Sequence, residues 1–247
     1  MIDVQDLTKT FDDVHALDGL SFCAEDGRVT GLIGPNGAGK TTAFRIVYGL
    51  LASDTGWAKV DGVDVAENRM EAQRNLGVLP DVRGLYPRLT AREHIRYFGQ
   101  LHGASGPELE ADINDLINRL GMQEFADRRA KGFSRGQELK VALGRAMVHR
   151  PKNLILDEPT NGLDVMSSRA VRALIEEMKA QGHCILISSH IMSEVSTLCD
   201  HLVIAAHGRL IAQGTPDHLR TLAGVDDLEE VFVRLLMKVG ALHGAAA

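Results

Sequence analysis

Short apolar runs alternate with amphipathic stretches along most of this chain. Four compact runs rich in Val, Ile and Leu predict buried strands, at residues 28–33, 153–156, 184–188 and 201–205. Apolar positions at helical spacing occupy the stretches between them, starting with residues 41–50 shortly after the first run. Strands that alternate with helices predict a parallel sheet that is covered by helices on both faces.

Other stretches depart from this alternation. Residues 91–120 carry two long helical patterns and no strand pattern, which predicts a helical lobe inserted into the α/β core. Residues 209–212 follow a His-Gly turn, and we expect them to pair back on the preceding strand as an antiparallel edge hairpin. The helical pattern at 226–240 is expected to pack back on the core or to contribute to dimerisation. The final LHGAAA is expected to fray.

The composition fits a single globular domain. The chain has 247 residues, 45% of them hydrophobic and 24% charged, which is enough to bury one core with a satellite lobe. We divide it into an α/β core of residues 1–80 and 136–224, an inserted helical subdomain of 81–135, and a C-terminal helix and tail of 225–247. A net charge of −6 argues against nonspecific nucleic-acid binding, because such proteins usually present a net basic surface.

The sequence also bears on location. Its longest apolar stretches, such as 184–187, fall far short of the roughly 20 residues that a membrane-spanning helix needs. The first residues include acids and lack the apolar segment of a secretory signal. Cys23, Cys184 and Cys199 are widely spaced and odd in number, which favours reduced core thiols over a disulfide framework or a metal site. We therefore expect a cytosolic protein.

A glycine-rich loop is the first candidate for chemistry. The segment GPNGAGKTT matches the pattern G-x-x-x-x-G-K-[ST] and lies between a predicted strand and a predicted helix, a context that argues against a chance glycine-rich turn. Its glycines let backbone N–H groups surround phosphate oxygens, beside the positive end of the helix. Lys40 is expected between the β- and γ-phosphates, and the Thr41 hydroxyl on Mg²⁺. The predicted nucleotide-binding residues are Gly34, Pro35, Asn36, Gly37, Ala38, Gly39, Lys40, Thr41 and Thr42.

Two acids end the apolar run NLILDEP. Asp157 and Glu158 are adjacent on a strand, where successive side chains alternate, so they can serve different partners. Asp157 is expected to hold Mg²⁺ through water, and Glu158 to orient or deprotonate the water that attacks the γ-phosphate. A solvated strand end would explain two acids alone, but the phosphate loop upstream favours the catalytic interpretation. The two motifs predict an α/β fold of the P-loop NTPase (RecA-like) type, with a mostly parallel sheet core, an antiparallel β edge and the inserted helical subdomain.

Three further segments carry a resemblance to a known family. FSRGQ at residues 133–137 precedes a helical pattern and resembles the signature motif of ATP-binding cassette (ABC) proteins. NGLD at 161–164 resembles their D-loop, and SSH at 188–190 resembles the segment with their switch histidine. Each segment is weak alone, but with the phosphate loop and the acid pair they form five elements in the family's order. The chain therefore resembles the ATP-binding subunit of an ABC transporter.

The resemblance implies an ATP site that two chains share. In this family two domains pack head to tail, and ATP lies between the phosphate loop of one and the signature of the other. Ser134, Gly136 and Gln137 would then belong to the site of the partner, with Ser134 and Gly136 donating to its γ-phosphate. His190 would hydrogen-bond the γ-phosphate, and Asp164 would connect the two sites. For His190 the alternative is a strand-end histidine with a local partner.

At three positions the resemblance is ambiguous or incomplete. Phe11 resembles the family's aromatic residue that stacks on adenine, although a core phenylalanine on the first strand is equally compatible. Arg135 stands where the family pattern has glycine, and its side chain is expected to point at solvent or at phosphate. Asp81 stands where the family usually has glutamine. Aspartate is shorter and charged but still suits a hard cation, so Asp81 joins Thr41 and Asp157 as a predicted Mg²⁺ residue.

The amino-acid sequences of several segments resemble one branch of the family. GVLPDVRGLYPRLTAREHI and ISSHIMSEVSTLCD are similar to the Nat-type sodium-efflux branch, whose ATP-binding subunits pair with a separate transmembrane permease. This resemblance implies a homodimer or heterodimer of ATPase subunits, peripheral on the cytoplasmic face of the cell membrane. The pair would hydrolyse ATP with Mg²⁺ to export sodium or a drug, and no direct contact with nucleic acid is expected.

Other functions fit the sequence less well. A soluble cassette ATPase that acts on nucleic acid or ribosomes is the main alternative, but such relatives carry insertions or a second cassette that this chain lacks. A regulatory cassette without activity is disfavoured because Lys40, Asp157, Glu158 and His190 are all present. A GTPase would need an N-K-x-D segment after the phosphate loop, and none follows.

Overall fold

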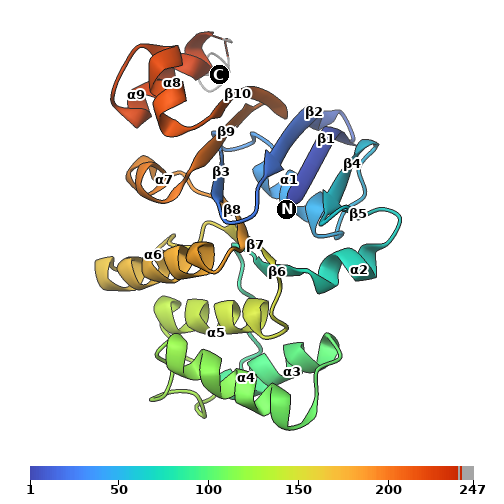
Figure 1. Ribbon diagram of the computed structural model, residues 1–247, viewed down its shortest axis with the longest axis vertical. Helices are drawn as coiled ribbons and strands as arrows, with labels where there is room; N and C mark the ends of the chain where they lie inside the picture. Colours follow the sequence, from blue (N-terminus) through green and yellow to red (C-terminus); the bar gives the residue numbers. More distant parts are fainter. Residues whose placement is uncertain (239, 241–247) are drawn as a thin grey trace.

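The computed structural model describes residues 1–238 and 240, and in that part of the chain ten strands form two sheets. The larger sheet has six strands in the order β10-β9-β3-β8-β7-β6 (Figure 1). These strands are β3 (Val29–Ile33), β6 (Leu76–Leu79), β7 (Asn153–Asp157), β8 (Cys184–Ser188), β9 (His201–Ala206) and β10 (Arg209–Gly214). Neighbouring strands from β9 to β6 run parallel, and β10 pairs antiparallel with β9. The parallel core and its antiparallel edge hairpin confirm the predictions from the sequence.

The central strands of this sheet are buried along their whole length. Every residue of β3, β7 and β8 is buried. A strand that is covered on both faces needs apolar side chains at nearly every position. That requirement explains why these strands are visible in the sequence as continuous apolar runs.

A smaller antiparallel sheet packs beside the larger one, and the sequence patterns did not predict it. Its strands are β1 (Ile2–Phe11), β2 (Val14–Ala24), β4 (Thr55–Val60) and β5 (Val63–Asp64), in the order β2-β1-β4-β5. Helix α1 (Lys40–Val47) contributes Phe44 and Val47 to one apolar cluster with Leu7 of β1 and Leu186 of β8. The cluster therefore joins the two sheets through the helix that follows the phosphate loop.

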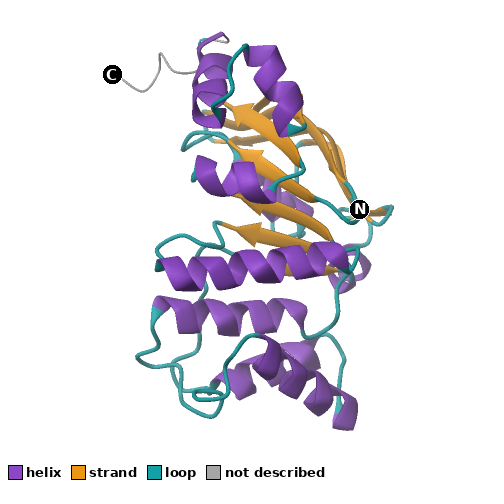
Figure 2. Cartoon of the chain, turned by 60° about the vertical axis from the view of Figure 1, so that its left-hand side comes forward, coloured by secondary structure: helices purple, strands orange, loops and turns teal. Residues whose placement is uncertain are grey.

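Helices account for most of the remaining chain. They are α2 (Arg69–Arg74), α3 (Ala91–Leu101), α4 (Gly106–Arg119), α5 (Arg135–Met147), α6 (Val165–Ala180), α7 (Met192–Leu198), α8 (Pro216–Ala223) and α9 (Leu228–Lys238). Figures 1 and 2 show α3, α4 and α5 together at the end of the molecule away from β9 and β10. Helix α5 also contacts β6, so it joins this helical layer to the large sheet. The two helices predicted within residues 91–120 are present as α3 and α4.

The first helix is shorter than the sequence predicts. The pattern indicated residues 41–50, but α1 ends at Val47 and Tyr48 caps it. Gly49 has φ 72, a left-handed backbone conformation that glycine adopts readily and that ends helices. Leu50, which extended the apolar pattern, is 70% exposed. The prediction was wrong at this end because an exposed leucine was counted as part of the buried face.

The C-terminal helix α9 packs back on the core, as expected. It contacts α7, α8 and β10, and its Val231 and Leu236 are buried. The final LHGAAA lies outside the described residues. The division of the chain into core, inserted subdomain and tail stays a prediction.

The three cysteines are free thiols, as the sequence favoured. Cys184 and Cys199 are buried, and burial raises the pKa of each thiol to about 12. Thiols with so high a pKa stay protonated at neutral pH and are poor nucleophiles. Across residues 1–238 and 240, no helix has the length and apolar character needed to cross a membrane.

Candidate functional site

The phosphate loop connects β3 to α1 in a conformation that depends on glycine. Gly39 is the N-cap of α1 and has φ 95. A methyl group built on Gly39 would lie 2.5 Å from the Ala16 carbonyl oxygen and 2.7 Å from Leu17 Cδ2. Both the backbone angle and the close approach of β2 therefore exclude a side chain here. The first turn of α1 is left without a side-chain cap, so its N–H groups face the loop.

Lys40 is half-buried within this loop and is held by carbonyl oxygens. Its ammonium Nζ donates to Gly34 O at 2.7 Å and to Pro35 O at 3.2 Å. Burial lowers the pKa of Lys40, while the nearby Glu158 and Asp157 carboxylates oppose that shift. A phosphate group would be a stronger partner for a desolvated ammonium than two neutral carbonyls. The side chain is thus suited to bind a phosphate anion.

Asp157 ends β7 beside Ser188 of β8, its partner in the parallel register. The Ser188 hydroxyl donates to Asp157 Oδ1 at 2.5 Å and accepts from the Glu158 backbone N–H at 3.0 Å. Burial raises the pKa of Asp157, the Ser188 hydrogen bond lowers it, and the negative charge of Asp81 raises it. The nearby Thr41 hydroxyl also lowers the pKa of Asp157. Two carboxylates and a hydroxyl therefore lie at one end of the cleft.

Glu158 adopts a backbone conformation that is unusual for a residue with a side chain. Its φ is 50, in the left-handed region, and such conformations cluster at functional sites. The conformation is supported by the hydrogen bond to Ser188 and by Asn161 N–H, which donates to Glu158 O at 3.2 Å. Glu158 Oε2 lies 2.8 Å from Nδ1 of His190, whose side chain is 57% exposed. The acid and the histidine thus form a pair at the mouth of the site.

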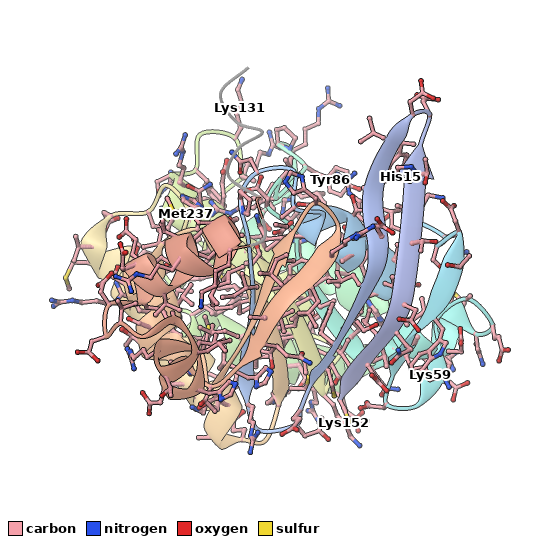
Figure 3. All side chains as sticks on the ribbon, turned by 90° about the horizontal axis from the view of Figure 1, so that it is seen from above. His15, Lys59, Tyr86, Lys131, Lys152 and Met237 are labelled. Atoms are coloured by element: carbon pink, nitrogen blue, oxygen red, sulfur yellow. The ribbon has the colours of Figure 1, made fainter. Side chains whose placement is uncertain are left out.

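These groups line one cleft with a volume of about 750 Å³. All nine residues of the phosphate loop contribute to it, together with Asp81, Asp157, Glu158 and His190. Figure 3 shows the labelled His15, which also lines the cleft, and Lys152, which precedes β7, on opposite sides of the molecule. Lys152 marks the side of the molecule at which β7 begins. The cleft, on the opposite side, is therefore at the carboxyl ends of the parallel strands, where ligands bind in open α/β sheets.

Sequence reasoning missed several residues of this cleft. They are Val14, His15, Ala16, Asn161, Met192 and Phe232. Asn161 is part of the NGLD segment and was within reach of the sequence. His15 pairs with Thr10 across the β1–β2 hairpin, and Phe232 comes from α9, so only the tertiary fold brings them to the cleft.

Phe11 lies outside the residues that line the cleft. It ends β1 at the hairpin, with a side chain that is 44% exposed and an aromatic ring 5.7 Å from Lys9 Nζ. The alternative of a core phenylalanine is wrong, because the ring is too exposed for a core position. Stacking of Phe11 on a base stays a prediction.

The signature segment begins helix α5 and does not line the cleft. Ser134 is the N-cap of α5, and its hydroxyl accepts from Gln137 N–H at 3.2 Å. Gln137 Oε1 in turn accepts from Ser134 N–H at 3.0 Å, which completes a capping box. Neither residue, nor Gly136, lines the cleft that holds Lys40. This motif therefore presents a helix N-terminus that its own phosphate loop does not use.

Asp164 caps the next helix, α6. Its carboxylate accepts from Ser167 N–H at 2.9 Å and from the Ser167 hydroxyl at 2.7 Å, and these hydrogen bonds lower its pKa. Asp164 is exposed and lies outside the cleft. Within its own chain it acts as a helix cap.

The residues near Asp157 suit a hard divalent cation when phosphates complete its coordination. Mg²⁺ is commonly held by one or two carboxylates together with substrate oxygens, and Asp157, Asp81 and Thr41 supply oxygen donors of that kind. Within residues 1–238 and 240, no group of three or more His, Cys, Asp or Glu side chains is placed to hold a metal by itself.

A strand that leads through a glycine loop into a helix, with a half-buried lysine and a carboxylate pair beside it, defines a P-loop nucleotide hydrolase. Comparison with known proteins narrows this class. The family model described as ABC transporter matches residues 17–161. ABC transporter ATP-binding protein NatA from Bacillus subtilis (strain 168) is 40% identical over 243 residues, which cover 96% of this chain and 99% of NatA.

Further relatives agree with this match. The probable multidrug ABC transporter ATP-binding protein YbhF from Escherichia coli (strain K12) is 33% identical over 96% of this chain, which spans 42% of YbhF. A solved structure of an ATP-binding subunit of an ABC transporter superposes with a TM-score of 0.88 and 31% identity, covering 95% of this chain and 99% of that one. The chain belongs to the ABC transporter family and is an ATP-binding subunit, an ATPase coupled to transport.

Proposed function

We propose that this subunit hydrolyses ATP in a head-to-tail dimer and thereby drives export through a separate membrane permease. The observation that carries the proposal is the separation of its motifs. Lys40, Asp157 and Glu158 line one cleft, whereas Ser134 and Gly136 lie outside it at a helix N-terminus with no ligand role in their own chain. A second copy placed head to tail would bring that helix end to the open side of the cleft.

Each side chain of the cleft has a role in this proposal. Lys40 exchanges its carbonyl partners for the β- and γ-phosphates. Glu158 orients or deprotonates the attacking water, and His190, now paired with Glu158, hydrogen-bonds the γ-phosphate. Ser134 and Gly136 of the facing chain donate to the same phosphate. Asp164 connects the two sites, Gln137 stabilises the signature helix, and Phe11 stacks on the adenine.

Thr41, Asp157 and Asp81 would hold Mg²⁺ in the same cleft. Asp81 lies close enough to Asp157 to raise its pKa, so the two carboxylates repel each other without a cation between or beside them. Mg²⁺ supplies positive charge that neutralises the phosphates during transfer. The chain's own contribution is to keep the oxygen donors in place, which Ser188 does for Asp157.

The relatives support a proposal for the cargo and the location. Sodium is our proposed cargo, because the chain aligns with nearly the whole of NatA and resembles the Nat-type sodium-efflux branch. A drug is the alternative cargo, since YbhF is named a probable multidrug transporter subunit. In either case we place the dimer, of identical or related subunits, on the cytoplasmic face of the membrane against its permease.

Substitution of Glu158 by glutamine tests the shared-site mechanism. The variant should bind ATP, lose turnover and accumulate as a dimer in ATP and Mg²⁺. The reason is that ATP still closes the dimer, whereas the hydrolysis that would open it again no longer occurs. Sedimentation or light scattering measures this, with exposed Glu124→Gln as the matched control. Monomers of the Glu158→Gln variant in saturating ATP would refute the shared site.

Purification from native membranes tests the partner and cargo. We expect a permease to copurify, and the reconstituted complex to move sodium in vesicles on ATP addition. Drug flux without sodium flux would overturn the proposal that sodium is the cargo. Copurification with ribosomes or nucleic acid and no membrane protein would instead favour the soluble class of cassette ATPases.

A further inference from the structure

The side chain of Arg135 crosses from the first turn of α5 to the loop that precedes α6. Its guanidinium lies directly over Gly162, where a methyl group built on the glycine would overlap Nη1 and lie 3.3 Å from Cζ and 3.4 Å from Cδ. Arg135 is exposed, in line with the solvent direction expected from the sequence, but its guanidinium also lies against the backbone of Gly162 and does not line the nucleotide cleft.

Only glycine fits at position 162 beneath the guanidinium of Arg135. Its φ is 71, a conformation that L side chains rarely adopt, and any Cβ would displace the guanidinium. The loop around it is held by two backbone hydrogen bonds, from Asn161 N–H to Glu158 O and from Leu163 N–H to Thr160 O, each 3.2 Å long. The planar arginine packs on the turn that these bonds define.

A second contact joins the same two segments. A methyl group built on Gly136 of α5 would lie 3.1 Å from Ser167 Oγ of α6. The same Ser167 hydroxyl donates to Asp164, the cap of α6. The first turns of α5 and α6 thus touch at two neighbouring points, Arg135 on Gly162 and Gly136 on Ser167.

The backbone of Arg135 is tied to a third segment. Arg83, two residues after Asp81, donates from Nη1 to Arg135 O at 2.8 Å, and Arg145 Nη1 donates to Arg83 O at 3.0 Å. Burial lowers the pKa of Arg83, Glu138 and Asp81 raise it, and the positive charge of Arg135 lowers it. Two arginines are held near each other here, so their positions are fixed by packing and hydrogen bonds against mutual repulsion.

No carboxylate accounts for the position of Arg135. Among the ion pairs formed by residues 1–238 and 240, none involves this guanidinium. It borders a hollow of about 560 Å³ that also includes Asp81 and Asn161, two residues of the nucleotide cleft. The arginine therefore connects the signature helix to a loop that reaches the site of its own chain.

We propose that Arg135 is a positioning residue that latches residues 160–164 onto the N-terminus of α5. The latch makes the signature and the D-loop move as one unit, so that both segments reach the ATP of a facing chain in a fixed relation. This second statement rests on the proposed dimer, whereas the contact within one chain does not. Glycine at position 135, as in the family pattern, would leave only the Gly136–Ser167 contact between the two segments and so couple them more loosely.

The first test measures the latch in the nucleotide-free chain by hydrogen exchange. In Arg135→Gly, the amides of Asn161 and Leu163 should exchange about fivefold faster, because local opening of the loop becomes easier. Arg135→Lys should show the same increase, since an ammonium cannot stack as a planar guanidinium does. Exposed Arg88→Gly is the matched control. Unchanged exchange in Arg135→Gly would overturn the proposal.

The second test separates positioning from a direct charge on phosphate. Positioning predicts that Arg135→Gly lowers kcat about fivefold with KM for ATP nearly unchanged, because the phosphate loop is intact. Gly162→Ala should lower kcat in the wild-type chain, and lower it less in the Arg135→Gly background, where the strain of the left-handed backbone remains but no guanidinium is displaced. Full rescue of kcat by Arg135→Lys, or additive effects of the two substitutions, would contradict the latch.

The two tests also separate this proposal from the dimer mechanism. Exchange is measured without nucleotide and without a second chain. If Glu158→Gln fails to dimerise while the Asn161 and Leu163 amides still respond to Arg135→Gly, the shared site is refuted and the latch stands. If Glu158→Gln dimerises and those amides do not respond, the latch is refuted alone.

Discussion

Lys40 and Asp157 are charged residues of the cleft that are both largely removed from solvent, Lys40 half-buried and Asp157 buried. Burial shifts both toward neutrality, lowering the pKa of Lys40 and raising that of Asp157. Each opposes the shift of the other, because opposite charges at short range favour ionisation. Phosphate oxygens beside Lys40 and a cation beside Asp157 would reinforce the charged forms. The charges of this site are therefore suited to a metal–nucleotide complex.

Asp81 offers a direct test of the metal assignment. Asp81→Asn should weaken Mg²⁺ affinity about 10- to 100-fold, the usual effect of losing a group that supports a metal site. It should also shift the acid limb of hydrolysis to lower pH, because the charge of Asp81 raises the pKa of Asp157. The weaker Mg²⁺ affinity lowers activity at limiting Mg²⁺, and a Mg²⁺ titration measures it. The shift of the acid limb raises relative activity at low pH, and a pH profile at saturating Mg²⁺ measures it. Asp12→Asn in the β1–β2 hairpin is the control, and full Mg²⁺ affinity in Asp81→Asn would remove Asp81 from the site.

Residue chemistry was predictable where a motif is continuous in the sequence. Residues 34–42, Asp157, Glu158 and His190 were named from short segments, and the fold brings them to one cleft. His15 and Phe232 were not named, because they reach the cleft only through a hairpin register and the packing of the last helix. The contact between Arg135 and Gly162 was missed for the same reason, because Gly162 lies in another segment of the chain.

At the scale of elements, α3 and α5 meet the large sheet through a stacked histidine pair. The rings of His102 and His149 lie 3.6 Å apart with an angle of 3° between their planes. His149 Nε2 also bonds the carbonyl of Leu76 in β6 at 3.1 Å. Burial and the neighbouring His102 lower the pKa of His149 to about 4. The neutral form is therefore the one that fits this junction.

This pair predicts an acid-sensitive junction. Between pH 6.5 and about 4 the unfolded chain binds a proton at position 149 that the folded chain does not, so the free energy of unfolding falls as the pH falls. His149→Phe keeps an aromatic ring in the stack and should lose less stability between pH 7.5 and pH 5 than the wild-type chain. Urea midpoints at the two pH values measure this, with His15→Phe as the control. Equal losses in wild type and His149→Phe would assign the acid sensitivity to other groups.

Elements were predictable where burial is complete on both faces. The strands β3, β7 and β8 are buried throughout and appear as continuous apolar runs. The strands β1 and β2 mix buried and exposed positions and their pairing contains register shifts, so no clean alternation marks them. Both the position of α1 between the two sheets and the small sheet itself therefore became visible only in three dimensions.

At the scale of the whole molecule, the proposed mechanism divides each ATP site between two chains. The cleft contains the groups proposed to bind phosphate and activate water, whereas the signature at the start of α5 does not line it. The latch from Arg135 to Gly162 ties that signature to the loop beside the cleft. A head-to-tail pair would use both half-sites of each chain, and a single chain would use neither completely.

Mixing two inactive variants tests this account most directly. Lys40→Ala destroys the phosphate loop, and Gly136→Asp places a negative charge where the signature should face phosphate. Asp near a helix N-terminus is compatible with folding, so the helix should persist. Each variant alone should be inactive. A mixed dimer keeps one site with an intact loop and an intact signature, so an equal mixture should regain about a quarter of wild-type hydrolysis if chains pair at random. Hydrolysis that stays at the level of the separate variants would contradict the shared site.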